Sequence, residues 1–230
     1  MNNILEIFNR ITLKNVRRRT LLIYLFMLNV ILSIAILVFS NAIISSSKAT
    51  GTIDYNTVRL FYTFAILVLF ILSYVLTPLF LSRSINSMYR DNIIDNLHSA
   101  RVKNSDIVLA VYLRGFTYLV IIITSALPIL SMSFLYGGVG AFSIAKILIA
   151  ILCYTILFSA ISMYISSTIY DLNISMVVSY VVGFILLVVT LVFLNYMISE
   201  FYYIFFYAFF ALFCTIILLY NTTNASMINM

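Results

Sequence analysis

The chain of 230 residues is 64% hydrophobic and only 9% charged, with a formal net charge of +6 at pH 7. Soluble domains carry about 25% charged residues, so this composition excludes a soluble fold and indicates an integral membrane protein. The two cysteines lie inside apolar stretches and are too few for a disulfide framework or a metal site.

Residues 1–19 precede the first apolar stretch and predict an amphipathic helix. Ile4, Ile7, Phe8 and Ile11 follow the spacing i, i+3, i+4, i+7 and form one apolar stripe. Because basic residues occupy its other faces, such a helix lies in the membrane interface, as an elbow before the first span. A helix that braces the bundle and a simple topology signal both fit this pattern.

Residues 20–230 hold six apolar stretches, and each is long enough for one crossing, which takes about 20 helical residues. Their expected limits are about 21–46, 58–82, 107–136, 143–169, 173–198 and 201–220. None shows the period-two alternation of a membrane strand. The expected fold is therefore an all-α six-span helical bundle.

Six spans place both termini on one side of the membrane, and the basic residues predict which side. With the N-terminus inside, the inner segments hold ten of the 13 Lys and Arg residues, namely Arg10, Lys14, Arg17, Arg18, Arg19, Arg83, Arg90, Arg101, Lys103 and Arg114. The outer loops hold only Lys48, Arg59 and Lys146. This imbalance predicts cytoplasmic termini and a cytoplasmic segment, 83–105, between the second and third spans.

Chemistry within the membrane is not expected. No Asp, Glu, Lys, Arg or His lies near the middle of any predicted span, which argues against an intramembrane enzyme and an ion-coupled carrier. The single histidine, His98, has no second His or Cys near it. The chain also lacks the G-x-x-x-x-G-K-[ST] phosphate-binding loop, so we expect no catalytic residue, no metal and no ATP site on it.

Weakly polar side chains are the remaining candidates within the spans. A path for an amphipathic substrate could be formed by Asn29, Ser33, Ser40, Ser73, Thr77, Thr124, Ser125 and Pro128. Helix packing is the alternative role for this group. In the fifth span, Ser175, Ser179 and Gly183 recur every four residues and form a small-residue stripe that predicts close helix packing.

The segment between the second and third spans has a distinctive pattern. Read as a helix, its apolar side holds Ile93, Ile94 and Leu97. Its polar surround holds Arg90, Asp91, Asp95 and His98. A short apolar patch with charged flanks suits docking into a groove of a soluble partner.

The layout resembles the membrane subunit of ABC transporters of the type-2 exporter permease family. In that family the segment has a charged start, then T-L-E-x-L-L-x-x-P-V-S-R-x-x-I, then a Gly-Lys pair. The matching positions here are Arg90 and Asp91 for the start, Ile94, Asp95 and Leu97 for L-E-x-L, Val102 for the valine, and Asp106 and Ile107 for the step into the third span. Arg101 stands where the proline is usual, and Ala110 and Val111 where Gly-Lys is usual.

The resemblance implies that Arg90, Asp91, Ile93, Ile94, Asp95, Leu97 and His98 form a coupling helix. It also implies cytoplasmic ABC ATPase subunits, which would carry ATP and Mg²⁺, and a second permease subunit, identical or related. No nucleic-acid partner is expected.

The size and residue bias resemble bacterial exporters of toxic amphipathic peptides, including the phenol-soluble-modulin exporters of staphylococci, which implies the bacterial plasma membrane. Alternatives are an exporter of antibiotics or lipid-linked glycans, and a non-transporting membrane protein for immunity or assembly.

Overall fold

The computed structural model describes residues 19–50, 55–90, 103–128, 130–131, 139–169 and 171–228. Its helices are α2 (Arg19–Thr50), α3 (Tyr55–Arg90), α5 (Asn104–Ser125), α7 (Ala141–Thr168), α8 (Leu172–Ser199) and α9 (Phe201–Ile228). No strand occurs within these described ranges. Residues 1–18 of the expected elbow helix and 91–102 of the expected coupling segment lie outside them.

All six helices contain a stretch that is long and apolar enough to cross a bilayer, which confirms the predicted number of spans. The stretches are Ile23–Lys48, Tyr55–Ser82, Ser105–Ser125, Ala141–Thr168, Leu172–Leu194 and Phe201–Ala225. An all-helical chain with these stretches has the make-up of a multi-pass membrane protein.

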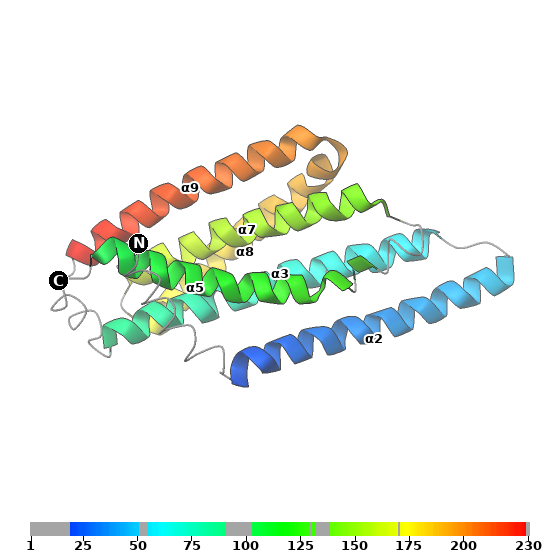
Figure 1. The fold of residues 1–230 in the computed structure, drawn as a ribbon, viewed down its shortest axis with the longest axis horizontal. Coiled ribbons are helices and arrows are strands. Elements are labelled where there is room, and N and C mark those ends of the chain that lie inside the picture. The colour runs from blue at the N-terminus through cyan, green and yellow to red at the C-terminus, as the bar shows by residue number, and fades with distance from the viewer. Residues whose placement is uncertain are drawn as a thin grey trace.

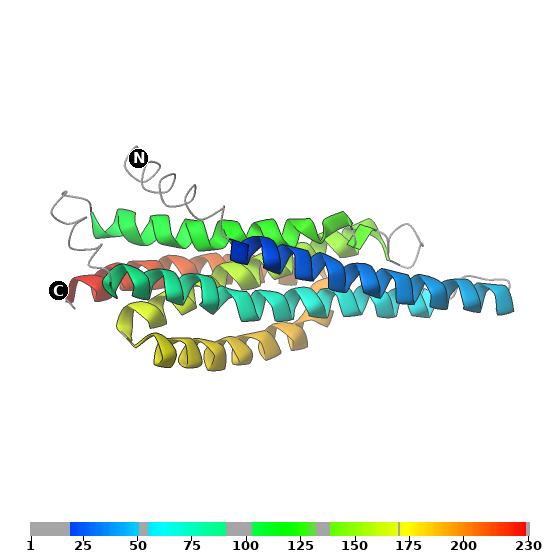
Figure 2. The same ribbon diagram turned by 90° about the horizontal axis from the view of Figure 1, so that it is seen from below.

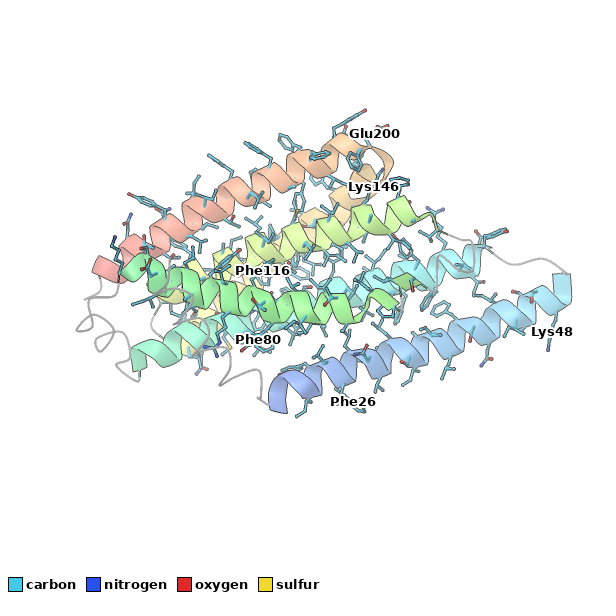
Figure 3. The ribbon with its side chains drawn as sticks, viewed as in Figure 1. Phe26, Lys48, Phe80, Phe116, Lys146 and Glu200 are labelled. Carbon is cyan, nitrogen blue, oxygen red and sulfur yellow. The ribbon has the colours of Figure 1, made fainter. Side chains whose placement is uncertain are left out.

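The helices run side by side and alternate in direction along the chain (Figures 1 and 2). We call the two ends of the bundle the Arg90 end, where α3 and α9 finish, and the Glu200 end, where α8 turns into α9. Figure 3 shows Lys48, Lys146 and Glu200 toward the Glu200 end. There the Lys146 ammonium lies 5.8 Å from the centre of the Phe201 ring.

Helix α7 is the centre of the bundle and contacts α3, α5, α8 and α9. Its small and apolar residues are buried along most of its length. By contrast, α2, α8 and α9 expose large apolar side chains such as Phe26, Val177 and Phe206. In a bilayer such side chains face lipid, so the helices are held together by close packing and interhelical hydrogen bonds rather than by exclusion of water.

Two prolines have different effects on their helices. Pro78 lies inside α3, which continues to Arg90. Near Pro128, in contrast, α5 ends at Ser125, and residues 127 and 128 are helical again after a break at Ala126. The break arises because Pro128 has no N–H to donate to the carbonyl of Thr124. The chain turns at Ala126, whose N–H donates to the carbonyl of Ile123 at 3.1 Å.

Arg114 lies midway along the apolar stretch of α5, closer to its centre than the predicted span limits imply. Its neighbour Gly115 packs against Leu81, one residue before the apolar stretch of α3 ends at Ser82. Arg114 is therefore level with the boundary of the apolar region of α3. From such a position a partly buried arginine can extend its guanidinium toward the membrane surface.

Candidate functional site

The most specific side-chain interactions between helices occur where α3, α7 and α8 meet, toward the Arg90 end. We call this the three-helix junction. It comprises Tyr74, Pro78 and Ser82 of α3, Phe158, Ser162 and Ser166 of α7, and Ser175, Ser179, Tyr180 and Gly183 of α8. Helix α8 follows α7 after a short turn, and the Asp171 side chain caps its start by accepting from the Asn173 N–H at 2.9 Å.

Two tyrosines connect α3 and α8 by reciprocal hydrogen bonds. The Tyr74 hydroxyl donates to the carbonyl of Tyr180 at 3.0 Å. The Tyr180 hydroxyl donates to the carbonyl of Val75, also at 3.0 Å. The two rings meet edge to face with their centroids 5.6 Å apart. This arrangement fixes α8 relative to α3 both along and around its axis.

Helix α7 enters the junction through Phe158, which is fully buried. Its ring stacks on Tyr74 with an interplanar angle of 15° and lies against Gly183 of α8. A Cβ atom at Gly183 would overlap this ring, so only glycine allows the observed approach. The aromatic stack therefore fills the space between all three helices.

Serine hydroxyls continue the junction toward the Arg90 end. Ser82 and Ser162 connect α3 to α7, with their Oγ atoms 3.2 Å apart. Ser175 of α8 donates to Ser166 of α7 at 3.0 Å. All four side chains are at most 1% exposed. Such interhelical bonds contribute about 0.6 kcal/mol each in a membrane protein, enough to favour one arrangement when several act together.

Some buried hydroxyls have no hydrogen-bond partner within the part of the chain that the structure describes. They are the hydroxyls of Tyr62, Tyr118, Tyr154 and Ser179. Tyr62 and Tyr154 belong to the main apolar cluster of the bundle, and the Tyr118 ring lies against Phe80 of α3, whereas Ser179 belongs to the row of serines in the junction.

The predicted substrate-path residues do not converge on one place. Ser73 and Thr77 are buried on α3 next to the junction. The other six are distributed between α2, which holds Asn29, Ser33 and Ser40, and the end of α5, which holds Thr124 and Ser125, with Pro128 just beyond it.

Most of these polar groups bond within their own helix. Thr77 donates to the Ser73 carbonyl at 2.6 Å, and the Asn29 amide to the Leu25 carbonyl at 2.9 Å. Ser40, Ser73, Thr124 and Ser125 likewise donate to carbonyls three or four residues earlier. Ser33 and Thr124 are exposed on the outside of the bundle.

The structure describes all of the predicted small-residue stripe but only one of the predicted coupling residues. The stripe of Ser175, Ser179 and Gly183 is buried, with Ser175 and Gly183 in contact with α7. Of the predicted coupling residues, Arg90 is the last residue of α3. Asp91, Ile93, Ile94, Asp95, Leu97 and His98 lie outside the described residues.

Sequence reasoning missed the α7 half of the junction. Phe158, Ser162 and Ser166 recur every four residues, as do Ser175, Ser179 and Gly183 on α8. Each helix thus carries a row of residues spaced by four, and the large Phe158 in one row is matched by Gly183 in the other. Such a pair of rows indicates two helices that pack along their i±4 ridges. Their pairing becomes evident only when both helices are placed.

The junction consists of neutral hydroxyls, aromatic rings and backbone carbonyls. It can bind neutral hydrogen-bonding groups and can hold helices in register. Within the described residues, no group of three or more His, Cys, Asp or Glu side chains could hold a metal ion. No protein-family model, no curated protein and no solved structure matches the chain.

Proposed function

We propose that the chain is the permease subunit of an ATP-driven ABC exporter in the bacterial plasma membrane, with both termini cytoplasmic. Two such subunits, identical or related, would enclose a path for an amphipathic or hydrophobic substrate. Toxic amphipathic peptides such as phenol-soluble modulins are the substrates we favour. Energy would come from cytoplasmic ATPase subunits, which would bind ATP and Mg²⁺.

The observation that carries this proposal is the continuity of α3. This helix has 36 residues, or about 54 Å, whereas the hydrocarbon core is about 30 Å thick. Its apolar stretch ends at Ser82, and the helix continues to Arg90. The apolar patch of Ile93, Ile94 and Leu97 follows directly in the sequence. A push on that patch would therefore reach a helix that is bonded to both α7 and α8.

Two exposed hydroxyl side chains, Ser33 and Thr124, support an amphipathic substrate. The exposed hydroxyls of Ser33 and Thr124 lie on the outer surface of the bundle, where a second subunit could cover them. Both side chains are uncharged, and Thr124 already bonds to its own backbone. A path with such walls would suit a molecule with apolar and polar faces better than an ion.

The first test is a pull-down of the tagged protein from its native membrane in mild detergent, followed by mass spectrometry. A soluble P-loop ATPase in near-stoichiometric amount is the expected result. Its reproducible absence from intact, folded protein would favour the non-transporting alternative.

The second test addresses coupling and export together. Leu97→Arg should abolish the ATPase activity stimulated by the membrane subunit, and with it protection of cells against an amphipathic peptide. Asn96→Arg is the matched control, because Asn96 lies off the apolar stripe. Normal stimulation in Leu97→Arg protein that inserts normally would refute docking at this patch.

A further inference from the structure

Ser179 is the least satisfied polar side chain of the three-helix junction. It is 0% exposed, and its hydroxyl has no partner among the described residues. A buried hydroxyl without a hydrogen bond is unfavourable, because its interaction with water or with lipid headgroups is lost without replacement. The serines on either side of it in space are all bonded. Ser179 is thus the one serine of the junction whose hydroxyl has no hydrogen-bond partner among the described residues.

The helix register indicates what Ser179 faces. Ser175 bonds to Ser166, and Gly183 lies against Phe158. Helices α7 and α8 are antiparallel, so four residues along one correspond to four residues back along the other (Figure 1). Ser179, midway between Ser175 and Gly183, therefore lies opposite Ser162, midway between Ser166 and Phe158. The two hydroxyls do not bond to each other, because Ser179 has no hydrogen-bond partner among the described residues.

On α3, the carbonyl of Tyr74 lacks its usual helical donor. Pro78 is inside this helix and has no N–H, so it cannot donate to the carbonyl of Tyr74 four residues earlier. Tyr180, the residue after Ser179, bonds to Val75 and accepts from Tyr74. These two bonds bring the Ser179 turn of α8 beside the Tyr74 turn of α3. The Tyr74 carbonyl, which lacks its usual helical donor, and the unbonded Ser179 hydroxyl therefore lie at the same level of the bundle.

We propose that a buried water molecule occupies this place and bridges Ser179, Ser162 and the Tyr74 carbonyl. Buried waters typically make about three hydrogen bonds to groups that would otherwise be unsatisfied. Proline-broken turns in membrane helices are satisfied by ordered waters and by serine or threonine of neighbouring helices. A monovalent cation fits less well, since the junction residues carry no negative charge to offset its desolvation. The inference depends on the junction alone and not on transport.

Thermal unfolding of the purified full chain tests the proposal. A bound water and an unpaired Ser179 hydroxyl predict changes in Tm of opposite sign when Ser179 is replaced by alanine. If water is bound, Ser179→Ala removes one of its partners and should lower Tm by about 2–4 °C. If the hydroxyl is simply unpaired, the same change removes an unfavourable group and should raise Tm. A raised Tm would overturn the proposal.

A double-mutant cycle with Pro78→Ala connects Ser179 to the α3 carbonyl. Replacing this proline restores an N–H for the Tyr74 carbonyl, so the water is needed less, and Ser179→Ala should then lower Tm by under half as much. Thr215→Ala is the matched control, because this buried threonine bonds to Leu212 of its own helix at 2.7 Å. Its effect on Tm should be the same with and without the Pro78→Ala change. Equal effects of Ser179→Ala in both backgrounds would refute a bridge to Tyr74.

A second measurement does not depend on stability. Brief radiolysis in oxygen-18 water should label Phe158, which is sealed from bulk solvent, in the unsubstituted protein and far less in Ser179→Ala. Absence of label at Phe158 in the unsubstituted protein would count against a buried water. If Tm rises with sodium or potassium, and not with choline at equal ionic strength, a cation rather than a water occupies the site, and the proposal of a water is wrong.

Discussion

The contact between Gly183 of α8 and the Phe158 ring of α7 sets how closely these helices approach. Gly183→Ala would put a methyl group into space that the ring occupies. The ring cannot easily move, because it stacks on Tyr74 and lies 5.7 Å from the Tyr154 ring, centroid to centroid. Overpacking of this kind costs about 1–3 kcal/mol.

Part of that cost is offset, since alanine is favoured over glycine within a helix by about 1 kcal/mol. The net destabilisation is then roughly 0–2 kcal/mol. For a chain of this size, each kcal/mol lowers Tm by about 2–4 °C, so we expect a decrease of up to about 8 °C. Thermal unfolding in detergent, followed by the fluorescence of a thiol-reactive dye, measures it.

Two other glycines serve as graded controls. At Gly115 a Cβ would lie 2.5 Å from Cδ2 and 2.7 Å from Cγ of Leu81, which is fully buried, so Gly115→Ala should also lower Tm. At Gly140, the N-cap of α7, nothing lies within 4 Å, so Gly140→Ala meets no clash and should lower Tm only slightly, because alanine is less favourable than glycine at an N-cap. Phe158→Leu should partly rescue Gly183→Ala. If Gly183→Ala is more stable than the unsubstituted protein, the helices are not held at the observed distance.

Two further predictions concern the junction and the orientation of the bundle. Tyr180→Phe removes the bond to the Val75 carbonyl and should lower Tm by a few degrees, about 1 kcal/mol, whereas Tyr220→Phe, at an exposed ring, should not. In a chain without its native cysteines, Phe142→Cys should react with a membrane-impermeant maleimide in intact cells, and Lys103→Cys only after lysis. The reverse labelling would contradict cytoplasmic termini.

The number of spans could be predicted from sequence because the bilayer imposes a simple rule. A crossing helix needs a long apolar stretch, and charged residues are confined to its ends. The end of α5 was harder to predict. The apolar sequence continues past Ser125, but Pro128 interrupts the helical hydrogen bonds within it. Hydrophobicity predicts what can enter a membrane, and backbone hydrogen bonding decides where a helix stops.

The junction could not be predicted in the same way. Both Ser73 and Thr124 were selected for their polarity, although Ser73 is buried and Thr124 is exposed. A serine bonds to its own helix in either setting, so its presence does not reveal which side of the helix is packed. Ser162 and Ser166 acquire significance only through Ser82 and Ser175 on other helices. Such contacts depend on helix rotation, which a single sequence leaves open.

The position of the junction bears on how α3 could move. Tyr74 and Tyr180 hold α3 to α8, while Ser82 holds α3 to α7 nearer the Arg90 end. Pro78 lies between these attachments and weakens the helix at one turn. A force applied beyond Arg90 would therefore act first on the Ser82 contact, with Pro78 as the hinge and the tyrosine pair as the fixed point. The tyrosine pair would then pass the load to α8, which is packed on one side and exposed on the other.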